Sequence, residues 1–479
     1  MSGEEATAAS LIGRIERLPF SRWHRGLVLL AAAGVLLDAA DFALFGAALP
    51  GISREFGFGP AQAGFLATIG LIGAFLGALF WGTISDYIGR RTAFAATIGI
   101  FAAFTGLVAA AWSAVSLGVF RFLSNFGLGG EIPVALTITA EFMPSRIRGR
   151  VASGVLAAFP LGLALAAGLS LVILPNYGWR MLFVAGVVPA VILVFVRRFM
   201  PESIRYLISR GKLQEASRTV AMIEQAAGVT SGAGVAQARH IPAPDVAVSP
   251  GITVLELLTP ERRRSTLLSW IVSFCFFWSS NGILFMLPTI LTQRGFPLSQ
   301  ALTFQLVQGL SGFFGYAACG FLIDRFGRRP VLFLYFFIGA GFHLWFAEAS
   351  GVWSYVAIAL VGLVNPGVYG STGVYVGELF PTHLRATAVG WFFGIGRIGS
   401  FLAPSVVGLL LAYGLGHYIL HTFALTFLLA SIAVVAIGIE TKGRVLEEIS
   451  ASPARGREPR QESGAAIVPP GGLPDYRAE

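Results

Sequence analysis

The chain has 479 residues, of which 55% are apolar and 12% are charged, and it carries a formal net charge of +9. Soluble globular proteins contain roughly 25% charged residues, so this composition excludes an ordinary soluble domain and indicates an integral membrane protein. The positive charge is expected to set the orientation in the bilayer and to favour anionic lipid, not to bind nucleic acid.

The segments that follow the N-terminus predict an all-α membrane protein. Residues 1–20 are polar and include acids, so we expect a cytoplasmic segment instead of a cleavable signal. About twelve apolar segments follow, each near the roughly 20 residues that a helix needs to cross a bilayer. The predicted spans are residues 26–50, 60–82, 92–112, 115–141, 151–174, 179–198, 265–291, 299–323, 330–348, 352–378, 386–413 and 416–438.

The distribution of basic residues predicts the orientation. With both termini in the cytoplasm, only Arg54, Arg180 and Arg294 lie in outer loops, and Arg121 and Arg397 lie within spans. The reverse topology would violate the positive-inside rule. We therefore expect a multi-pass protein of the cell (inner) membrane.

Charged residues inside the spans are the first functional signal. Asp38 and Asp41 share one face of the first span, about 18 and 23 Å beyond its start. An ionised carboxylate at such depth costs roughly 2.5 to 3.5 kcal/mol. Glu131 in the fourth span and Arg397 in the eleventh lie at a similar depth, and Arg121 lies in the outer portion of the fourth span. These charges indicate that the protein handles protons or a substrate.

The chain also repeats itself. Residues 82–91 (GTISDYIGRR) recur 238 positions later as residues 320–329, and residues 141–148 (EFMPSRIR) recur 237 positions later as residues 378–385. Two unrelated motifs with nearly the same offset indicate a duplicated unit of six spans.

Five domains follow from this repeat and from composition. The linker contains a basic amphipathic segment from Pro201 to about Ala226 and then a Gly/Ala/Pro-rich stretch, and the tail is expected to be largely disordered. The predicted domains are a cytoplasmic N-terminus (1–25), a first six-helix bundle (26–198), a cytoplasmic linker (199–264), a second six-helix bundle (265–438) and a cytoplasmic tail (439–479).

Taken together, these motifs resemble the major facilitator superfamily. Within it they are similar to the metabolite:proton symporters of the aromatic-acid and niacin type, close to the sugar porters. The matching residues are Gly82, Asp86, Gly89, Arg90, Arg91, their repeats Gly320, Asp324, Gly327, Arg328 and Arg329, then Arg121-Phe-Leu with Gly127, Gly129 and Gly130, Pro201-Glu202-Ser203, and Glu440-Thr-Lys-Gly443-Arg-Val-Leu-Glu447-Glu448.

The resemblance implies alternating access, in which two bundles rock about a central site. Acids and arginines at the cytoplasmic ends would pair to bias that motion, with Glu141 bracing Arg148 and Glu378 bracing Arg385; the alternative is that these cations only anchor the topology. The predicted cytoplasmic gate comprises Asp86, Arg90, Arg91, Glu141, Arg148, Asp324, Arg328, Arg329, Glu378 and Arg385.

The resemblance also implies a proton-coupling group made of Asp41, Asp38, Arg121 and Glu131. Asp41 aligns with the family acid that pairs with the arginine of the fourth span, here Arg121. The pair is either a coupling switch or a static salt bridge. Asp38 is a second proton site or a partner that orients Asp41, and Glu131 is either functional or an interhelical hydrogen-bond partner.

The predicted substrate is a small organic acid, aromatic or heteroaromatic. Arg397 is a cation with no acid in its own span, and Phe277, Trp278 and Asn281 of the seventh span could hold a flat ring and orient a polar group. The glutamines that sugar porters usually carry in this span are absent. Sugar or polyol symport, export, and a receptor that does not transport remain alternatives.

No enzyme, cofactor or metal site is predicted. Cys275 and Cys319 lie in apolar spans and are interpreted as buried small side chains. His417 and His421 have helical spacing and could form a ligand pair, but an interfacial location is favoured. The expected partners are a small-molecule substrate, protons and the lipid bilayer, with the protein a monomer.

Overall fold

The computed structural model describes residues 3–187, 200–229, 255–380 and 382–441, and every regular element among them is helical. The elements are α1 (Gly3–Glu16), α2 (Arg22–Phe56), α3 (Pro60–Ile88), α4 (Arg90–Ala109), α5 (Ala114–Leu128), α6 (Glu131–Phe142), α7 (Ser145–Leu156), α8 (Ala158–Ala185), α10 (Ile204–Ser209), α11 (Leu213–Ala226), α13 (Arg263–Gln293), α14 (Leu298–Phe326), α15 (Arg328–Glu348), α16 (Val352–Glu378), α17 (Thr382–Ala412), the 3₁₀ helix η1 (Gly416–Tyr418) and α18 (Ile419–Ile437).

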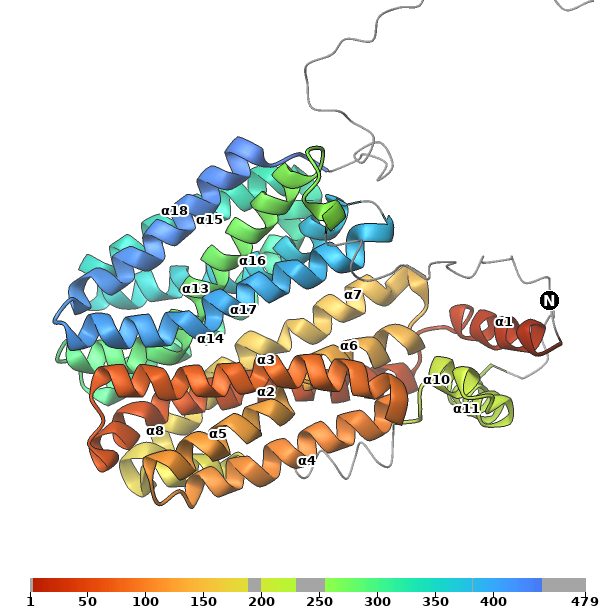
Figure 1. Ribbon diagram of the computed structural model, residues 1–479, viewed down its shortest axis with the longest axis horizontal. Coiled ribbons are helices and arrows are strands. Elements are labelled where there is room, and N and C mark those ends of the chain that lie inside the picture. The colour runs from red at the N-terminus through yellow and green to blue at the C-terminus, as the bar shows by residue number, and fades with distance from the viewer. Residues whose placement is uncertain (1–2, 188–199, 230–254, 381, 442–479) are drawn as a thin grey trace, which may run out of the picture.

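The helices form two bundles, α2 to α8 and α13 to α18 (Figure 1). Within the described ranges, ten helices are long and apolar enough to cross a membrane. Helices α5 and α6 together make the fourth crossing. The predicted fold class, an all-α membrane protein of two six-helix bundles, is confirmed. The predicted span 179–198 is described only as far as Val187, after a kink at Gly178 where φ is +73°.

Glycine and proline fix the end of α2 and the start of α3. Helix α2 stops where Gly57 adopts φ of +69°, a left-handed conformation that favours glycine. Pro60 then opens α3, where its missing N–H is no loss. The Gln62 side chain accepts a 2.7 Å hydrogen bond from the Gly59 amide. The connection between the first two spans is therefore short and fixed.

The predicted continuous span 115–141 is broken in the structure. Helix α5 ends at Leu128 and α6 begins at Glu131. A Cβ on Gly129 would collide with the Ala74 backbone, and one on Gly130 with the Trp81 side chain. Because α3 approaches this closely, two glycines are required at the break, and Glu131 is placed in the first turn of a new helix.

The two bundles meet mainly through α2 with α13, α3 with α17, and α8 with α14. Thr68 of α3 donates a 2.7 Å hydrogen bond to the Phe401 carbonyl of α17. Nearby, a Cβ on Gly64 would meet the Pro404 carbonyl. These close contacts lie toward the end of the bundles that holds Gly57 and Pro60, which we call the far end.

The opposite end, which we call the basic end, holds Arg90, Arg91, Arg328 and Arg329. Figure 1 shows the bundles closest together at the far end and spread apart at the basic end. The ion pairs described at the basic end each lie within one half of the chain. The structure is therefore a state closed at the far end.

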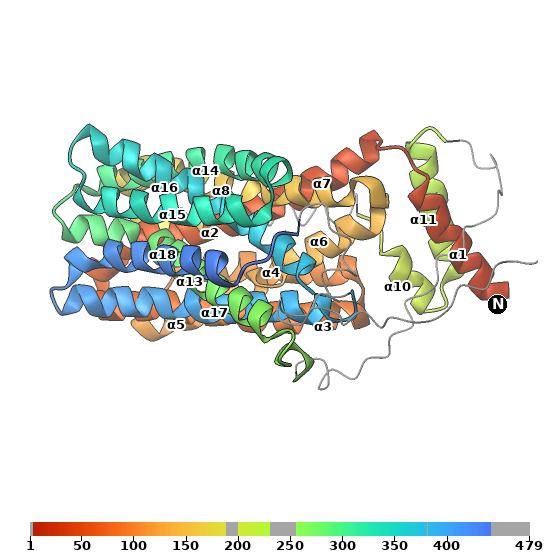
Figure 2. The same ribbon diagram turned by 90° about the horizontal axis from the view of Figure 1, so that it is seen from above.

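A small helical layer lies beyond the basic end of the first bundle, where α11 packs against both α1 and α10 (Figure 2). Leu11 and Ile15 of α1 are buried in the same apolar cluster as Val220 of α11, and Arg14 lies 2.6 Å from Glu224. The Glu224 carboxylate raises the pKa of the Arg14 guanidinium. The sequence predicted the amphipathic segment but not its helical partner α1.

Candidate functional site

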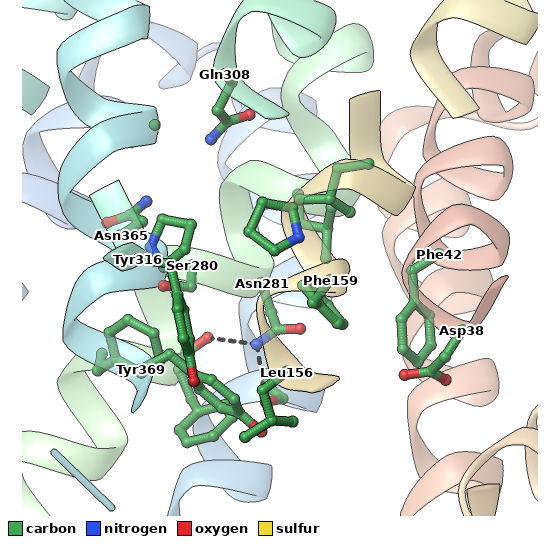
Figure 3. A pocket seen from close by; sticks show the side chains of 18 of the residues that line it. Asp38, Phe42, Leu156, Phe159, Ser280, Asn281, Gln308, Tyr316, Asn365 and Tyr369 are labelled. Carbon is green, nitrogen blue, oxygen red and sulfur yellow. Dashed lines mark hydrogen bonds between the residues drawn. The ribbon is translucent and has the colours of Figure 1, made fainter. Parts of the chain in front are cut away.

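A cavity lies between the two bundles, at about mid-length of their helices (Figure 3). Its volume is about 130 Å³, counted as the space that the centre of a water molecule can reach. Its walls come from α2, α6, α7, α8, α13, α14, α16 and α17. The lining residues are Asp38, Phe42, Ile132, Leu156, Phe159, Pro160, Leu163, Phe276, Phe277, Ser280, Asn281, Leu284, Gln308, Tyr316, Gly362, Asn365, Pro366, Tyr369, Arg397 and Ser400.

Opposite charges face the cavity from the two bundles. Asp38 of α2 is 3% exposed, and Arg397 of α17 is half-buried. The charge of Arg397 acts on the Asp38 carboxyl, yet no described residue forms an ion pair within 4 Å of Arg397. The arginine is thus a half-buried cation with donors available to a ligand.

Several neutral polar atoms of the cavity wall have no partner among the described residues. Both amide atoms of Asn365 and the Ser280 hydroxyl are buried without a hydrogen bond. Asn281, by contrast, donates a 3.1 Å hydrogen bond to the Ser400 hydroxyl and another to the Phe277 carbonyl. Buried polar groups are normally paired, so Asn365 and Ser280 are suited to a bound molecule.

Aromatic rings form much of the remaining wall. Phe277 packs edge-on against Tyr369, and Phe159 and Tyr316 face the same space. The predicted residues Arg397, Asn281 and Phe277 all line the cavity. Trp278 does not, because it lies on the next position of the helix and its ring stacks on Phe274 outside the cavity.

Asp41 and Arg121 form a buried ion pair behind the cavity wall. Arg121 Nη1 donates a 3.0 Å hydrogen bond to Asp41 Oδ1, and Nη2 lies 2.7 Å from Oδ2. The arginine is 1% exposed, and its guanidinium lies 4.3 Å from the centre of the Phe45 ring. This contact joins α2 to α5, as the aligned family positions implied.

Glu131 completes a group of three acids around α2. Its carboxylate lies against Gly34, where a Cβ would collide with it. The charges of Asp38 and Asp41 both act on it. Glu131 is 2% exposed, and no ion pair with it is found among the described residues, although it stands at a helix N-terminus that favours negative charge.

At the basic end of each half, a carboxylate caps the N-terminus of the helix that begins with two arginines. In the first half, Glu202 accepts a 3.2 Å hydrogen bond from the Arg91 amide, and Gly89 leaves room for it with φ of +94°. Arg90 lies 3.7 Å from Glu141, whose carboxylate also accepts a hydrogen bond from the Ser203 hydroxyl. The PES motif is therefore part of the capping network.

The second half repeats this network. Glu440 accepts 3.0 Å hydrogen bonds from the amides of both Arg328 and Arg329. Arg328 also pairs with Glu378 at 2.9 Å, and Thr441 donates to Glu378 at 2.5 Å. Glu440 and Thr441 follow Glu202 and Ser203 by 238 positions, so the sequence repeat extends to these two motifs.

Two predicted pairings at the basic end are not formed in this structure, which is open at that end. Arg148 lies 2.9 Å from Glu16 of α1 instead of pairing with Glu141, which is engaged by Arg90 and Ser203. Arg385 donates a 2.8 Å hydrogen bond to the Gly377 carbonyl, because Arg328 already occupies Glu378. Asp324 lies 3.5 Å from Arg328. The Asp86 side chain falls outside the described residues.

The sequence reasoning missed several residues of the cavity. Gln308 and Asn365 are neutral polar side chains within apolar spans. They are therefore a weaker signal of a functional site than the intramembrane acids. Tyr369, Tyr316 and Phe159 carried no such signal, because aromatic residues are frequent throughout the spans.

Two bundles of membrane-spanning helices that enclose a polar and aromatic cavity at their interface define a membrane transporter. The chain belongs to the Major Facilitator Superfamily, whose family model matches residues 31–404 and 307–465. The resemblance inferred from the motifs is confirmed. Members of this family are transporters and not enzymes, so the protein is a multi-pass transporter with a small-molecule substrate.

Relatives in bacteria share most of the chain. It is 32% identical over 441 residues to the niacin transporter NiaP of Acinetobacter baylyi, covering 92% of this chain and 99% of the relative. It is 26% identical to a benzoate transport protein of the same species, covering 90% and 92%. It is 28% identical to the 4-hydroxybenzoate transporter PcaK of Pseudomonas aeruginosa, covering 89% and 95%.

Solved structures share the fold. The xylose transporter XylE from E. coli, in a partially occluded inward-open conformation, aligns with a TM-score of 0.68 at 19% identity. The alignment covers 89% of this chain and 100% of that chain. At this identity the likeness concerns the fold alone.

Proposed function

We propose that the protein is a proton-coupled symporter of a small aromatic or heteroaromatic carboxylate, working by alternating access. The single observation that carries this proposal is the cavity between the bundles, in which Arg397 faces a ring-lined space without an ion-pair partner among the described residues. An aromatic acid would place its carboxylate at the guanidinium and its ring among Phe277, Tyr369 and Phe159.

The names of the relatives support the substrate class. They are transporters of niacin, benzoate and 4-hydroxybenzoate, which are all carboxylic acids on a flat ring. The unpaired amide of Asn365 could bind a ring substituent or ring nitrogen. A sugar substrate has no equivalent support, because a sugar carries no charge for Arg397.

Proton coupling is proposed from the acids around α2. Asp41 is held by Arg121 in this state, whereas Asp38 faces the cavity opposite Arg397. Entry of a substrate anion would draw Arg397 away from Asp38, so that Asp38 is better stabilised when protonated. In this proposal Asp41, Asp38 and Glu131 share the coupling, and Arg121 controls the charge of Asp41.

The orientation and organisation are part of the proposal. The basic end is assigned to the cytoplasm by the positive-inside rule, which makes the described state inward-facing. The capping networks of Glu202 and Glu440 would stiffen each bundle so that it moves as one body. The proposal also includes a location in the inner membrane, domain boundaries at residues 198 and 265, and a monomeric state.

Binding of acids and their amides to the purified protein tests the substrate class. Nicotinate and benzoate should bind, whereas the neutral analogues nicotinamide and benzamide, and xylose, should bind much more weakly. In Arg397→Gln the acids should lose roughly 10- to 150-fold in affinity, since a hydrogen bond to a charged group is worth about 1.5 to 3 kcal/mol. Equal affinity for acid and amide in the native protein would contradict the proposal.

Flux separates a transporter of this kind from a receptor or an exporter. In proteoliposomes, an acidic exterior should drive accumulation of the labelled acid, and dissipation of the pH gradient should abolish accumulation but leave exchange. Binding without flux would support a receptor. Accumulation driven only by the opposite gradient would support an exporter.

A further inference from the structure

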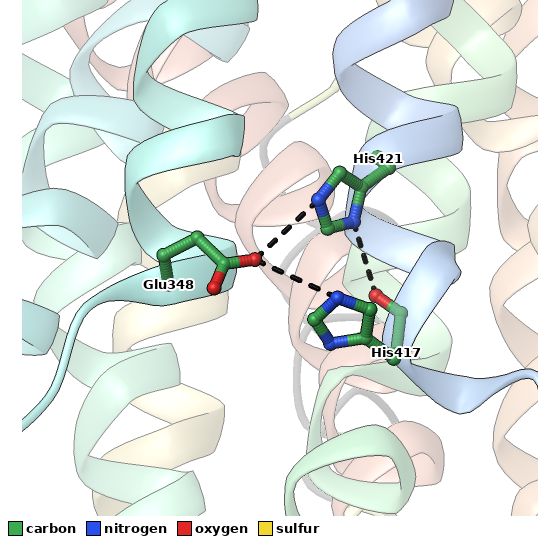
Figure 4. Close-up of side chains that lie close together, drawn as sticks. All are labelled: Glu348, His417 and His421. Atoms are coloured by element: carbon green, nitrogen blue, oxygen red, sulfur yellow. Dashed lines mark hydrogen bonds and ion pairs between the residues drawn. The ribbon is translucent and has the colours of Figure 1, made fainter.

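Three side chains with metal-binding atoms converge at the far end of the second bundle (Figure 4). Glu348 is the last residue of α15, His417 lies in η1, and His421 lies in the first turn of α18. Glu348 Oε1 is 3.4 Å from His421 Nε2 and 3.8 Å from His417 Nε2. One ligand atom from each residue lies within 4.8 Å of the other two.

The hydrogen bonding of His421 prepares it for metal binding. Its Nδ1 lies 3.1 Å from the His417 carbonyl oxygen. A carbonyl can only accept a hydrogen bond, so Nδ1 carries the hydrogen, and in the neutral ring the lone pair is on Nε2, facing Glu348. Metal-ligating histidines typically donate their other ring N–H to such a carbonyl.

Arg294 holds the backbone around the three side chains. It donates hydrogen bonds of 3.3 Å to the carbonyls of Ala347 and His417. Ala347 directly precedes Glu348, and His417 is itself one of the three residues. The site is therefore fixed from α13 as well as from its own elements, as a preorganised site requires. The Arg294 charge also acts on Glu348 and opposes cation binding, and the Tyr418 ring flanks both histidines.

We propose that Glu348, His417 and His421 bind a divalent transition-metal ion of the Zn²⁺ type. Zn²⁺ takes nitrogen and carboxylate oxygen at about 2.0 to 2.2 Å in tetrahedral geometry, which separates ligand atoms by roughly 3.3 to 3.6 Å. The Glu348–His421 distance of 3.4 Å is within that range. His417, whose Nε2 lies 3.8 Å from Glu348, must move closer to reach the ion. Water completes the coordination of an open site with three protein ligands.

The metal would tie α15 to α18 without joining the two bundles. Both helices belong to the second bundle, and they pack together along their length. Because the rocking motion displaces whole bundles, the bound ion stabilises one of them and does not lock the protein. The site is independent of the proposed substrate, so failure of one proposal leaves the other unaffected.

Calorimetric titration of the full-length protein with Zn²⁺ tests the site, after removal of any affinity tag that binds metal. A single equivalent should bind, with affinity falling as the pH drops because protonated histidines cannot ligate. Glu348→Gln, His417→Gln and His421→Gln should each weaken binding by more than the roughly 10- to 100-fold that loss of an outer partner costs.

Tyr418→Phe is the matched control, because it changes a neighbouring side chain that offers no ligand to the site. It should bind Zn²⁺ like the native protein, and Zn²⁺ should raise the melting temperature of both but not of His421→Gln. Absence of binding to the native protein would leave only histidine–glutamate ion pairs and overturn the proposal. The proposal would also be overturned if the three ligand variants bound Zn²⁺ with the affinity of the native protein.

Discussion

Neutralising Asp41 should separate a coupling switch from a static salt bridge. Asp41→Asn leaves the Arg121 guanidinium 1% exposed and without its counter-charge. The contact between Arg121 and the Phe45 ring, at 4.3 Å, remains. Breaking a buried pair from one side costs about 3 to 5 kcal/mol, and the cation–π contact does not offset this cost because the native protein already has it. We therefore expect a marked loss of thermal stability.

The double variant Asp41→Asn, Arg121→Met removes both charges. Replacement of a buried ion pair by apolar or neutral groups of similar size is often close to neutral for stability. The double variant should thus recover most of the stability that Asp41→Asn loses. Measured together with Arg121→Met and the native protein, the two variants complete a double-mutant cycle that gives the coupling energy of the pair. A static bridge and a switch make the same prediction up to this point.

Transport distinguishes the two interpretations. If the pair is only a static bridge, the stable double variant should accumulate the labelled acid under an imposed pH gradient as the native protein does. If Asp41 couples protons, the double variant should exchange substrate but not accumulate it. Proteoliposome uptake and counterflow, measured on the same preparation, provide both readouts. Full gradient-driven accumulation by the double variant would refute the coupling role.

The remaining predictions concern the cavity and the basic end. Asn365→Ala should weaken substrate binding while Trp278→Phe should not, because only Asn365 lines the cavity; the reverse order in a binding titration would refute the assignment of the wall. Glu440→Gln should lower the melting temperature more than Glu202→Gln, because Glu440 accepts two hydrogen bonds at 3.0 Å from backbone amides of the helix that it caps, α15, and Glu202 accepts one at 3.2 Å from an amide of α4. Each cap is worth about 0.5 to 2 kcal/mol. Arg148→Ala should make α1 more sensitive to proteolysis, and unchanged digestion would show that its ion pair with Glu16 does not hold α1.

Much of the fold could be predicted because the bilayer imposes simple rules. Long apolar runs must be helical, since every backbone polar group in a membrane has to be satisfied within the segment. The break at Gly129 and Gly130 was not predicted, because those residues look like ordinary packing glycines until the position of Ala74 and Trp81 is known. Helix α1 was also missed, since its apolar face is short and becomes buried only in the tertiary structure, in the cluster that includes Val220 of α11.

The candidate site divides in the same way. Charges in apolar segments are costly wherever the helices end up, so Asp38, Asp41, Arg121, Glu131 and Arg397 could be found from the sequence. Which charges meet could be inferred only for Asp41 with Arg121, through the family resemblance. The positions of Asn365, Tyr369 and Trp278 relative to the cavity depend on helix rotation, which local sequence does not encode.

The sequence by itself determined the class of protein, the two-fold repeat and the charged residues that a membrane interior does not tolerate without a reason. The tertiary structure alone decided the partners. It paired Arg148 with Glu16 and Arg328 with Glu378, and it joined Glu348 to two histidines that lie far along the chain. The physical reason is that an ion pair has a range of only a few ångströms, so it depends on how distant segments pack.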